Sequence, residues 1–356
     1  MRFAPVEPAQ IVFDEDGLPR SLQYGDVYHA RAGALEQARS VFLQGNDLPQ
    51  RWQGRERFVI LETGFGLGHN FLATWQAWRE DAHRPSRLFF ISVEKHPALR
   101  ADLERAHQAL KGSGVEDLAR QLHANWPDAS PDVHRLSFES DRVVLLLAHA
   151  DVSVALREFR LQADACFLDG FSPKCNEAMW SDPVLKALGR LTGEGSTAAT
   201  WSAASTVRKG LESAGFMVHR RDGFADKREM TVAVRRGHRR PIVPGKWETR
   251  ATSSASSTSS ASIPSTPTAP STLRPPVLII GAGLAGAACA QALAASGVPS
   301  LVLDRLASPA GGASGNPAGL VHGVVHAEDG AHARLSRAAA LMAQRHYGSL
   351  IEAGAI

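Results

Sequence analysis

Short apolar runs alternate with longer amphipathic stretches over the first 236 residues of the chain. The runs have the length and composition of buried β-strands, and they lie at residues 58–61, 88–93, 143–147, 165–168 and 197–201. Between them, residues 70–79 and 97–110 carry apolar side chains at helical spacing. Alternating strands and helices predict an α/β domain built on a parallel, doubly wound sheet. Ligands of such sheets lie beyond the carboxyl ends of the strands, so the residues that follow each run are the candidates for chemistry.

A segment of low complexity interrupts this pattern. Residues 251–272 contain only Ala, Ser, Thr and Pro apart from Ile263, so they cannot form a core and are typical of a flexible linker. The chain has 356 residues, more than the roughly 100–200 of an ordinary domain, which also favours two folded parts. We therefore predict a first domain at 1–248, a linker at 249–275 and a second domain at 276–356.

The first predicted strand leads directly into a glycine-rich loop. The sequence FVIL is followed by Glu62-Thr63-Gly64-Phe65-Gly66-Leu67-Gly68 and then by the helical pattern NFLATWQAW. Glycines permit a tight turn and a close approach of a ligand to the backbone, and the helix that follows offers free amides. An acid two residues before a GxGxG loop resembles the first motif of Rossmann-like S-adenosylmethionine-dependent methyltransferases. We predict cofactor contacts from Glu62, Gly64, Gly66 and Gly68.

Two further acids follow the next strands of the pattern. Glu94 ends LFFISV and could accept hydrogen bonds from both ribose hydroxyls, and Asp151 follows VVLLLAHA at a position that resembles the adenine-contacting acid of such enzymes. The alternative interpretation is structural, because a glycine-rich turn is often only a turn and an acid at a strand end is usually a helix cap. The register after three successive strands favours the cofactor site.

The fourth strand ends in a stretch rich in polar and aromatic residues, DACFLDGFSPKCNEAMW. Asp169 and Gly170 lead into a turn that contains Pro173 and Asn176 and ends at Trp180, an arrangement suited to a small reactive centre. A surface loop whose Trp180 covers the core is an equally good interpretation of this stretch alone. Further along, TWSAAS and GFADKREM precede a helix pattern and the strand TVAVR.

Taken together, these segments carry a specific resemblance. YGDVYHARAGALEQARSVFLQ, ETGFGLGHNF, LDGFSPKCNEAMW, TWSAASTVRKGLESAGF and GFADKREM resemble the methyltransferase domain of the bifunctional tRNA 5-methylaminomethyl-2-thiouridine biosynthesis family over about residues 10–236. Ser172, Cys175 and His29 depart from the residues expected at their positions, and none of them belongs to the cofactor motif.

The resemblance implies a tRNA-modifying enzyme that acts on the wobble uridine of the anticodon. Its first domain would methylate the primary amine of 5-aminomethyl-2-thiouridine with S-adenosylmethionine, giving 5-methylaminomethyl-2-thiouridine. A complete second domain would first remove a carboxymethyl group with FAD. Asp169 is our candidate for the catalytic residue that takes the amine proton. Two alternatives stay open: a small-molecule N-methyltransferase fused to a flavoprotein fragment, and a non-catalytic remnant that binds RNA or flavin.

The charge distribution bears on the partner. The net charge is +3, yet residues 208–250 hold 12 Lys or Arg against 5 Asp or Glu, an excess of +7 that leaves −4 for the remainder. A basic region suits a polyanion, and we predict tRNA contacts from Lys227 and Arg228. A solvated face followed by the start of a linker explains the charge equally well.

A second glycine-rich loop follows the linker. VLII runs into a loop with Gly281, Gly283 and Gly286, and Asp304 ends the next strand, as in a dinucleotide-binding fingerprint. The stretch GGASGNPAG at 311–319 resembles the second FAD loop of glycine-oxidase-like flavoproteins, with a solvent loop as the alternative. From Pro276 only 80 residues remain, too few for a flavin oxidase, so we expect a partial domain from a truncated product, a fragment or an incomplete gene model.

Composition, cysteine spacing and the lack of long apolar stretches indicate a globular protein. With 44% hydrophobic and 21% charged residues the chain can bury a core, which argues against a fully disordered protein. Cys166, Cys175 and Cys289 lack paired metal-ligand spacing and cannot form a disulfide framework. The amino terminus lacks the apolar stretch of a signal peptide, and no window reaches 18 apolar residues. We expect a monomeric, cytoplasmic protein without bound metal or membrane contact.

Overall fold

The computed structural model describes residues 5–237, 275–316, 319, 323, 324, 326, 328–352 and 354. Contacts divide the chain into two units, Met1–Arg239 with Leu320–Ile356, and Arg240–Gly319. The predicted linker at 249–275 lies outside the described residues except for Pro275.

Ten strands lie in the first unit among the described residues: β1 (Ile11–Phe13), β2 (Pro19–Ser21), β3 (Arg57–Glu62), β4 (Arg87–Glu94), β5 (Asp132–Phe138), β6 (Val143–His149), β7 (Ala163–Phe167), β8 (Thr192–Thr200), β9 (Phe216–Asp222) and β10 (Glu229–Arg235). The α-helices there are α1 (Ala34–Gln37), α2 (His69–Glu80), α3 (Arg100–His107), α4 (Glu116–Ala124), α5 (Val152–Glu158), α6 (Asp182–Leu191), α7 (Ser205–Ser213) and α9 (Ala331–Glu352). Short 3₁₀ and π-helical turns follow α1 and α3 and precede β3 and α6.

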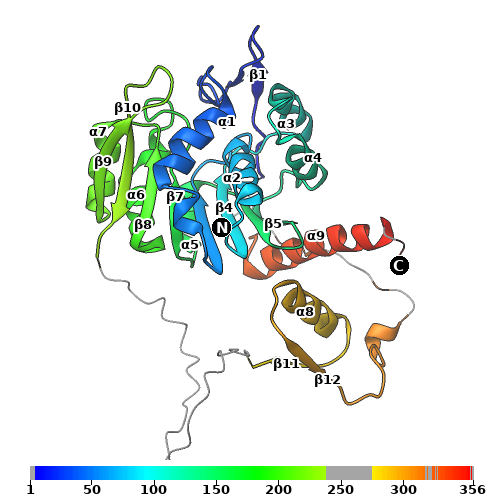
Figure 1. The fold of residues 1–356 in the computed structure, drawn as a ribbon. Coiled ribbons are helices and arrows are strands. Elements are labelled where there is room, and N and C mark those ends of the chain that lie inside the picture. Colours follow the sequence, from blue (N-terminus) through cyan, green and yellow to red (C-terminus); the bar gives the residue numbers. More distant parts are fainter. Residues whose placement is uncertain are drawn as a thin grey trace, which may run out of the picture. The chain divides into compact units, whose positions relative to one another are not determined.

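Eight of these strands form one mixed sheet in the order β5-β6-β4-β3-β7-β8-β10-β9 (Figure 1). The five strands from β6 to β8 pair in parallel, as expected. The complete sheet is mixed, because β5 runs antiparallel to β6 at one edge and β10 runs antiparallel to β8 and β9 at the other. The β5–β6 connection is a tight turn in which residues 139, 140 and 141 have φ of 53°, 56° and 65°. A connection this short cannot make the crossover that parallel strands need.

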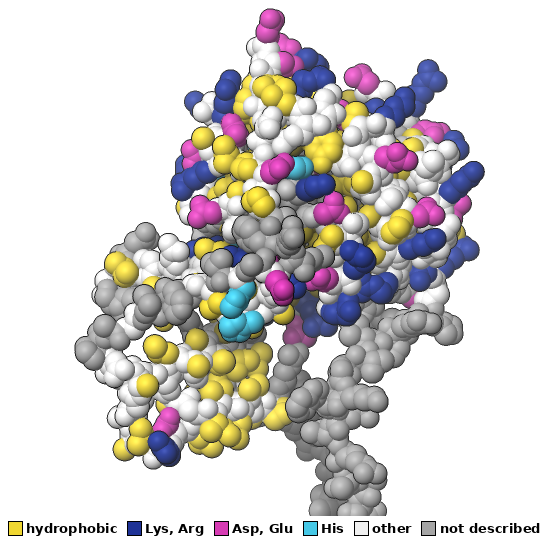
Figure 2. All heavy atoms as spheres, turned by 180° about the vertical axis from the view of Figure 1, so that it is seen from behind, with side chains coloured by type: hydrophobic (Ala, Val, Ile, Leu, Met, Phe, Trp, Pro, Cys, Tyr) yellow, Lys and Arg dark blue, Asp and Glu magenta, His cyan; other side chains and the backbone are white. Residues whose placement is uncertain are grey.

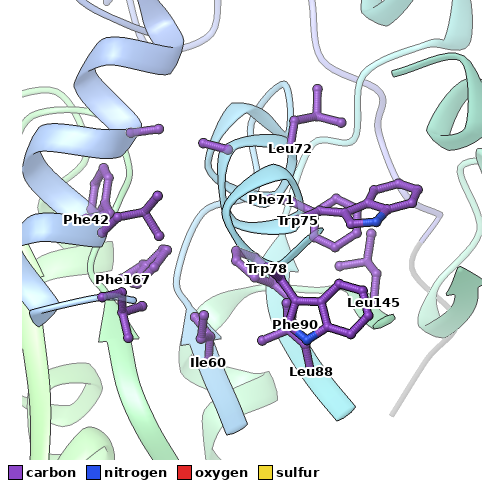
Figure 3. Packing of buried hydrophobic residues seen from close by; sticks show 14 of the residues in the cluster. Phe42, Ile60, Phe71, Leu72, Trp75, Trp78, Leu88, Phe90, Leu145 and Phe167 are labelled. Carbon is purple, nitrogen blue, oxygen red and sulfur yellow. The ribbon is translucent and has the colours of Figure 1, made fainter. Parts of the chain in front are cut away.

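The core lies on both faces of the sheet. On one face, Phe71, Trp75 and Trp78 of α2 recur at helical spacing, are at most 1% exposed, and belong to the cluster that includes Leu88 and Phe90 of β4 (Figure 3). On the other face, helices α5, α6 and α7 bury a second cluster against the same strands. The sheet is therefore covered on both sides, which leaves its carboxyl edge as the place for a ligand.

The second unit contains the strands β11 (Val277–Ile280) and β12 (Ser300–Leu303), which pair in parallel, and the helix α8 (Leu284–Ala295) between them. Its strands expose large apolar side chains: Ile280 is 86% exposed and Leu301 52%. Figure 2 shows hydrophobic side chains gathered on this unit. These apolar side chains therefore form an exposed hydrophobic surface on the two-stranded sheet of this unit.

Candidate active site

A cavity of about 530 Å³ opens at the carboxyl edge of the large sheet. Residues that follow five neighbouring strands line it, in the order of the sheet: Asp151 after β6, Glu94 at the end of β4, Gly64 and Gly66 after β3, Asp169 after β7, and Trp201 after β8. The chain proceeds from β3 to β4 on one side and reaches β7 on the other side only later. The cavity therefore lies at a topological switch point, where doubly wound sheets bind ligands.

The first glycine-rich loop has the backbone that its sequence predicted. Gly66 and Gly68 have φ of +54° and +75°, a region that side chains other than glycine rarely adopt. A Cβ on Gly64 would lie 2.9 Å from the carbonyl oxygen of Asp169, so this glycine lets β3 and β7 approach each other. Gly64 and Gly66 line the cavity, whereas Gly68 precedes α2 and is not among the lining residues.

The Glu94 carboxylate is held in place by two backbone donors. The N–H of Gly66 donates to Oε2 at 2.7 Å and that of His96 to Oε1 at 2.8 Å. Burial raises the pKa of Glu94 to about 7, although these backbone hydrogen bonds act in the opposite direction. A carboxylate of this kind gains most from a ligand that brings hydroxyl donors or positive charge.

Asp151 caps a helix and also lines the cavity, while its contact with adenine stays a prediction. It caps α5 by accepting hydrogen bonds from the backbone N–H and the hydroxyl of Ser153 at 2.9 and 2.7 Å, and it also lines the cavity. Lys95 approaches it to 3.2 Å. Burial alone would raise the pKa of Asp151, but the bonds from Ser153 and Lys95 lower it.

Glu62 lies behind the cavity. It is fully buried, it does not line the cavity, and its carboxylate accepts hydrogen bonds from Ser92 Oγ at 2.6 Å and from Asn70 Nδ2 at 2.9 Å. Burial raises its pKa well above the usual range. In this structure Glu62 supports the loop, and its predicted contact with the cofactor stays a prediction.

Asn70 joins Glu62 to the candidate catalytic acid. Its Nδ2 donates to Asp169 Oδ2 at 2.7 Å as well as to Glu62, while the backbone N–H of Gly170 donates to Asp169 Oδ1 at 2.8 Å. Burial raises the pKa of Asp169 to about 6, with hydrogen bonds from Gly170, Asn70 and Trp201 opposing the shift. An acid with this pKa accepts a proton effectively near neutral pH. Asn70 was missed because nothing in the sequence indicates which buried amide will lie between two acids.

A wall of the cavity comes from the chain before the large sheet. The ring of Tyr24 stacks on Phe171 with 4.7 Å between centroids, and Tyr28 meets Phe171 edge-on at 5.1 Å. Asp26 Oδ2 accepts a hydrogen bond from the backbone N–H of Ser172 at 2.9 Å. These residues belong to a segment that supported the resemblance but received no role from the sequence. Their aromatic clustering beside a Gly-Asp turn was the only signal available.

The opposite wall follows β8 and the β9–β10 turn. Trp201, Phe224 and Lys227 line the cavity, and Lys227 Nζ lies 5.4 Å from the centroid of the Trp201 ring. Arg228 is exposed and is not among the lining residues. Glu229 pairs with Arg220 at 3.2 Å rather than with a neighbouring cation.

Trp180 matches the structural interpretation of its loop. It is 7% exposed, belongs to a core cluster, and donates its indole N–H to the carbonyl of Phe171 at 2.8 Å. It therefore covers the core and at the same time supports the loop that carries Asp169.

The loop of the second unit also has the predicted geometry. Gly281 has φ of +107°, and a Cβ on Gly286 would lie 1.8 Å from the Gly281 carbonyl oxygen, so α8 can approach β11 only with glycine there. Leu284 N donates to Ser314 Oγ at 3.1 Å beside Gly283. Asp304 accepts hydrogen bonds from Ala282 N at 2.7 Å and Leu306 N at 2.8 Å. Of the predicted second flavin loop, Pro317 and Ala318 lie outside the described residues.

The described residues offer neither a metal cluster nor a membrane-spanning helix. No group of three or more His, Cys, Asp or Glu there could hold a metal ion, and no helix there is long and apolar enough to cross a membrane. The three cysteines are free thiols.

The sheet order, the loop after β3 and the acids after β4 and β6 define the fold of S-adenosylmethionine-dependent methyltransferases. A family described as S-adenosyl-L-methionine-dependent methyltransferase matches residues 113–236, and one described as FAD dependent oxidoreductase matches residues 276–355. A solved structure, that of MNMC2 from Aquifex aeolicus, is similar with a TM-score of 0.51 and 26% identity, covering 64% of this chain and 70% of that one.

The chain is also similar to curated proteins of one name. The chain is 48% identical over 357 residues to the tRNA 5-methylaminomethyl-2-thiouridine biosynthesis bifunctional protein MnmC of Methylibium petroleiphilum, covering 100% of this chain and 51% of the relative. It is 45% identical over 350 residues to the protein of that name from Aromatoleum aromaticum, covering 98% and 51%. The chain is similar to these proteins over nearly all of its own length, and it spans about half the length of the curated relatives it matches.

Proposed function

We propose that the first unit methylates the primary amine of 5-aminomethyl-2-thiouridine at the wobble position of tRNA, with S-adenosylmethionine as the methyl donor. The observation that carries this proposal is the position of Asp169. It lies after β7, between the strands whose acids suit the cofactor and the strand that carries Trp201. The relatives named for biosynthesis of this nucleoside support the choice of substrate.

The residues present fit S-adenosylmethionine. Gly64 and Gly66 leave room for a ligand beside the backbone, Glu94 offers acceptors for ribose hydroxyls, and Asp151 lies beyond Glu94 toward the adenine side. When bound, S-adenosylmethionine supplies an electrophilic methyl group on a sulfonium ion. A cation also suits the cavity, because Glu94 and Asp169 both lie at its wall and both have a raised pKa.

The chain's own contribution is orientation and proton transfer. Asn70 and Gly170 fix the two oxygens of Asp169 by hydrogen bonds, so the carboxylate has one preferred direction. Asp169 accepts a proton from the substrate ammonium group, which frees the nitrogen lone pair for attack on the methyl carbon. Holding amine and donor in line is the larger contribution, and such positioning can account for roughly 7–11 kcal/mol of a reaction barrier.

For the partner we propose tRNA bound through Lys227 and Arg228. Lys227 lies at the cavity and Arg228 is exposed beside it. Replacing both with alanine should weaken tRNA binding and reduce the slope of log affinity against log salt, while leaving affinity for S-adenosylmethionine unchanged. An unchanged salt slope would show that neither side chain meets phosphate.

The second unit fits part of an FAD site. Gly281, Gly283 and Gly286 would approach the pyrophosphate and Asp304 the ribose, and the flavin would supply oxidation of the carbon next to an amine. We propose that the carboxymethyl group is removed by the complete form of this second domain. We also propose the domain limits 1–248 and 276–356 with a linker between them, a monomer, and a cytoplasmic location.

The decisive experiment uses the full chain with labelled S-adenosylmethionine and tRNA that carries 5-aminomethyl-2-thiouridine. Incorporation of label into that nucleoside, found by nucleoside analysis, is the expected result. Labelling of the free nucleoside but not of tRNA would favour a small-molecule N-methyltransferase instead. Absence of label from both substrates would refute the proposed activity.

A further inference from the structure

The strand order divides the cavity into two halves. Asp151, Glu94 and Gly66 follow β6, β4 and β3, so the half along these strands is taken by the cofactor in the proposed function. Asp169 follows β7 at the border. The half beyond it is lined by residues from β8 onward, namely Trp201, Ala204, Phe224 and Lys227. The methyl-accepting molecule must occupy this second half, because the acid lies between the two.

Trp201 presents the large flat surface of that half. Its side chain is partly buried and packs against a core cluster, so its orientation is fixed. The ring of Trp180 meets it edge-on with 6.5 Å between centroids, which supports the indole from the side of the core. Lys227 Nζ lies 5.4 Å from the centroid of the Trp201 ring. Lys227 therefore lies over the face of the indole, a face whose π-electrons suit a cationic or planar partner.

We propose that this half of the cavity is the nucleobase subsite, in which the base of the modified nucleoside stacks on the indole of Trp201. The proposal rests on the proposed function, since it names the residue that holds the substrate of that reaction. Proteins that act on single nucleotides of RNA commonly take the base out of its strand and stack it on an aromatic side chain. Trp201 also contacts Asp169 through its side chain, so a base on the indole brings its substituent to the acid.

When the base binds, Lys227 exchanges its contact with the indole of Trp201 for a contact with phosphate. The base replaces the ammonium group over the indole, and the released cation pairs with a phosphate next to the extruded nucleotide. This exchange explains how one lysine both lines the cavity and lies in an exposed turn. It also makes entry of the base and binding of the backbone mutually dependent.

The test compares Trp201→Ala with Trp201→Phe in a background of Asp169→Asn, so that binding is measured without turnover. Equilibrium binding of tRNA carrying 5-aminomethyl-2-thiouridine is recorded with S-adenosylhomocysteine present. Loss of stacking in Trp201→Ala should lower tRNA affinity about 5- to 140-fold, the equivalent of one stacked base. The phenylalanine variant keeps an aromatic face and should stay within about threefold of the parent. Affinity for S-adenosylhomocysteine, measured by calorimetry, should be the same in all three.

A second pair of variants tests the lysine. Lys227→Met should lower tRNA affinity and reduce the salt slope by about 0.7–0.9, the value for one phosphate contact. Lys209→Met is the matched control, because Lys209 lies exposed on α7 and does not line the cavity.

The outcomes separate this proposal from the proposed function. Equal tRNA affinity of the Trp201→Ala and Trp201→Phe proteins would overturn the base subsite, even if the parent methylates tRNA. If the parent transfers no methyl group but Trp201→Ala still loses tRNA affinity, the proposed methylation fails and the base subsite stands. A loss in both variants together with loss of S-adenosylhomocysteine binding would show that Trp201 only maintains the fold, and would also overturn the subsite.

Discussion

Replacing Asn70 with alanine should destabilise the first unit in a pH-dependent manner. The side chain of Asn70 is 7% exposed and gives one hydrogen bond to Glu62 at 2.9 Å and one to Asp169 at 2.7 Å. The variant leaves both buried carboxyl groups without that donor, and no other side chain described at these distances can replace both bonds. Asn70 therefore allows two acids to lie close together inside the protein.

The magnitude follows from the kind of bond that is lost. Each hydrogen bond to a charged group contributes about 1.5–3 kcal/mol, and the variant loses two such bonds. Because entry of water offsets part of this loss, we expect the unfolding free energy at pH 8 to decrease by about 2–4 kcal/mol. The sign with pH follows from the raised pKa values of both acids. Their ionised forms destabilise the folded state, so the deficit should shrink as pH falls through about 6, the pKa of Asp169.

The measurement is urea unfolding followed by tryptophan fluorescence at pH 6 and pH 8. The seven tryptophans are Trp52, Trp75, Trp78, Trp126, Trp180, Trp201 and Trp247, so residues 275–356 contribute no signal. Gln76→Ala is the matched control, because it removes an amide side chain from the same helix. The Gln76 amide oxygen accepts a part-buried hydrogen bond from Arg39 at 2.7 Å. A deficit in Asn70→Ala below 1 kcal/mol, or one that grows toward pH 6, would refute the reasoning.

Three further predictions concern the cofactor, the acid and the second unit. Glu94→Ala should weaken S-adenosylmethionine binding, measured by calorimetry, about 5- to 150-fold, since the ribose hydroxyls lose their acceptor. Unchanged affinity would show that the cofactor does not bind at Glu94. The rate of methyl transfer by the parent should fall as pH drops below about 6, because Asp169 then holds its own proton. The Asp169→Asn variant should bind S-adenosylmethionine normally and transfer the methyl group slowly at every pH. Parent-like rates in that variant would make Asp169 structural. Gly286→Val should speed proteolysis of the second unit, since even a Cβ would lie 1.8 Å from the Gly281 carbonyl oxygen; an unaltered digestion rate would contradict this close approach.

The sequence predicted the central part of the fold well because its strands are continuous apolar runs. Strands β3, β4, β6 and β7 are buried on both faces, and residues 58–61 or 143–147 read as strands without knowledge of any partner. Strand β9 was missed because only its first residue is buried, so no apolar run marks it. Strand β5 was missed since it alternates buried and exposed residues at the edge of the sheet.

The sequence predicted some residues of the candidate site and not others. Residues at or just beyond a strand end, such as Glu94 and Asp169, could be predicted because the carboxyl ends of parallel strands meet at one edge. The roles of Asn70 and Tyr24 could not be predicted, because they depend on contacts with Asp169 and Phe171, which are about 100 and 150 positions away in the sequence. The supporting role of Glu62 also required the structure, since burial rather than sequence position separates it from the cavity.

The wall formed by Tyr24 and Tyr28 has a consequence for how the protein is made. The cavity closes only when this early segment meets Phe171, and its far side is supplied by Lys227. On the ribosome, the chain can therefore complete this cavity only after the β9–β10 hairpin has emerged, when all strands of the large sheet have been synthesised. A nascent chain stalled before that hairpin should be recognised by chaperones and proteases as unfinished.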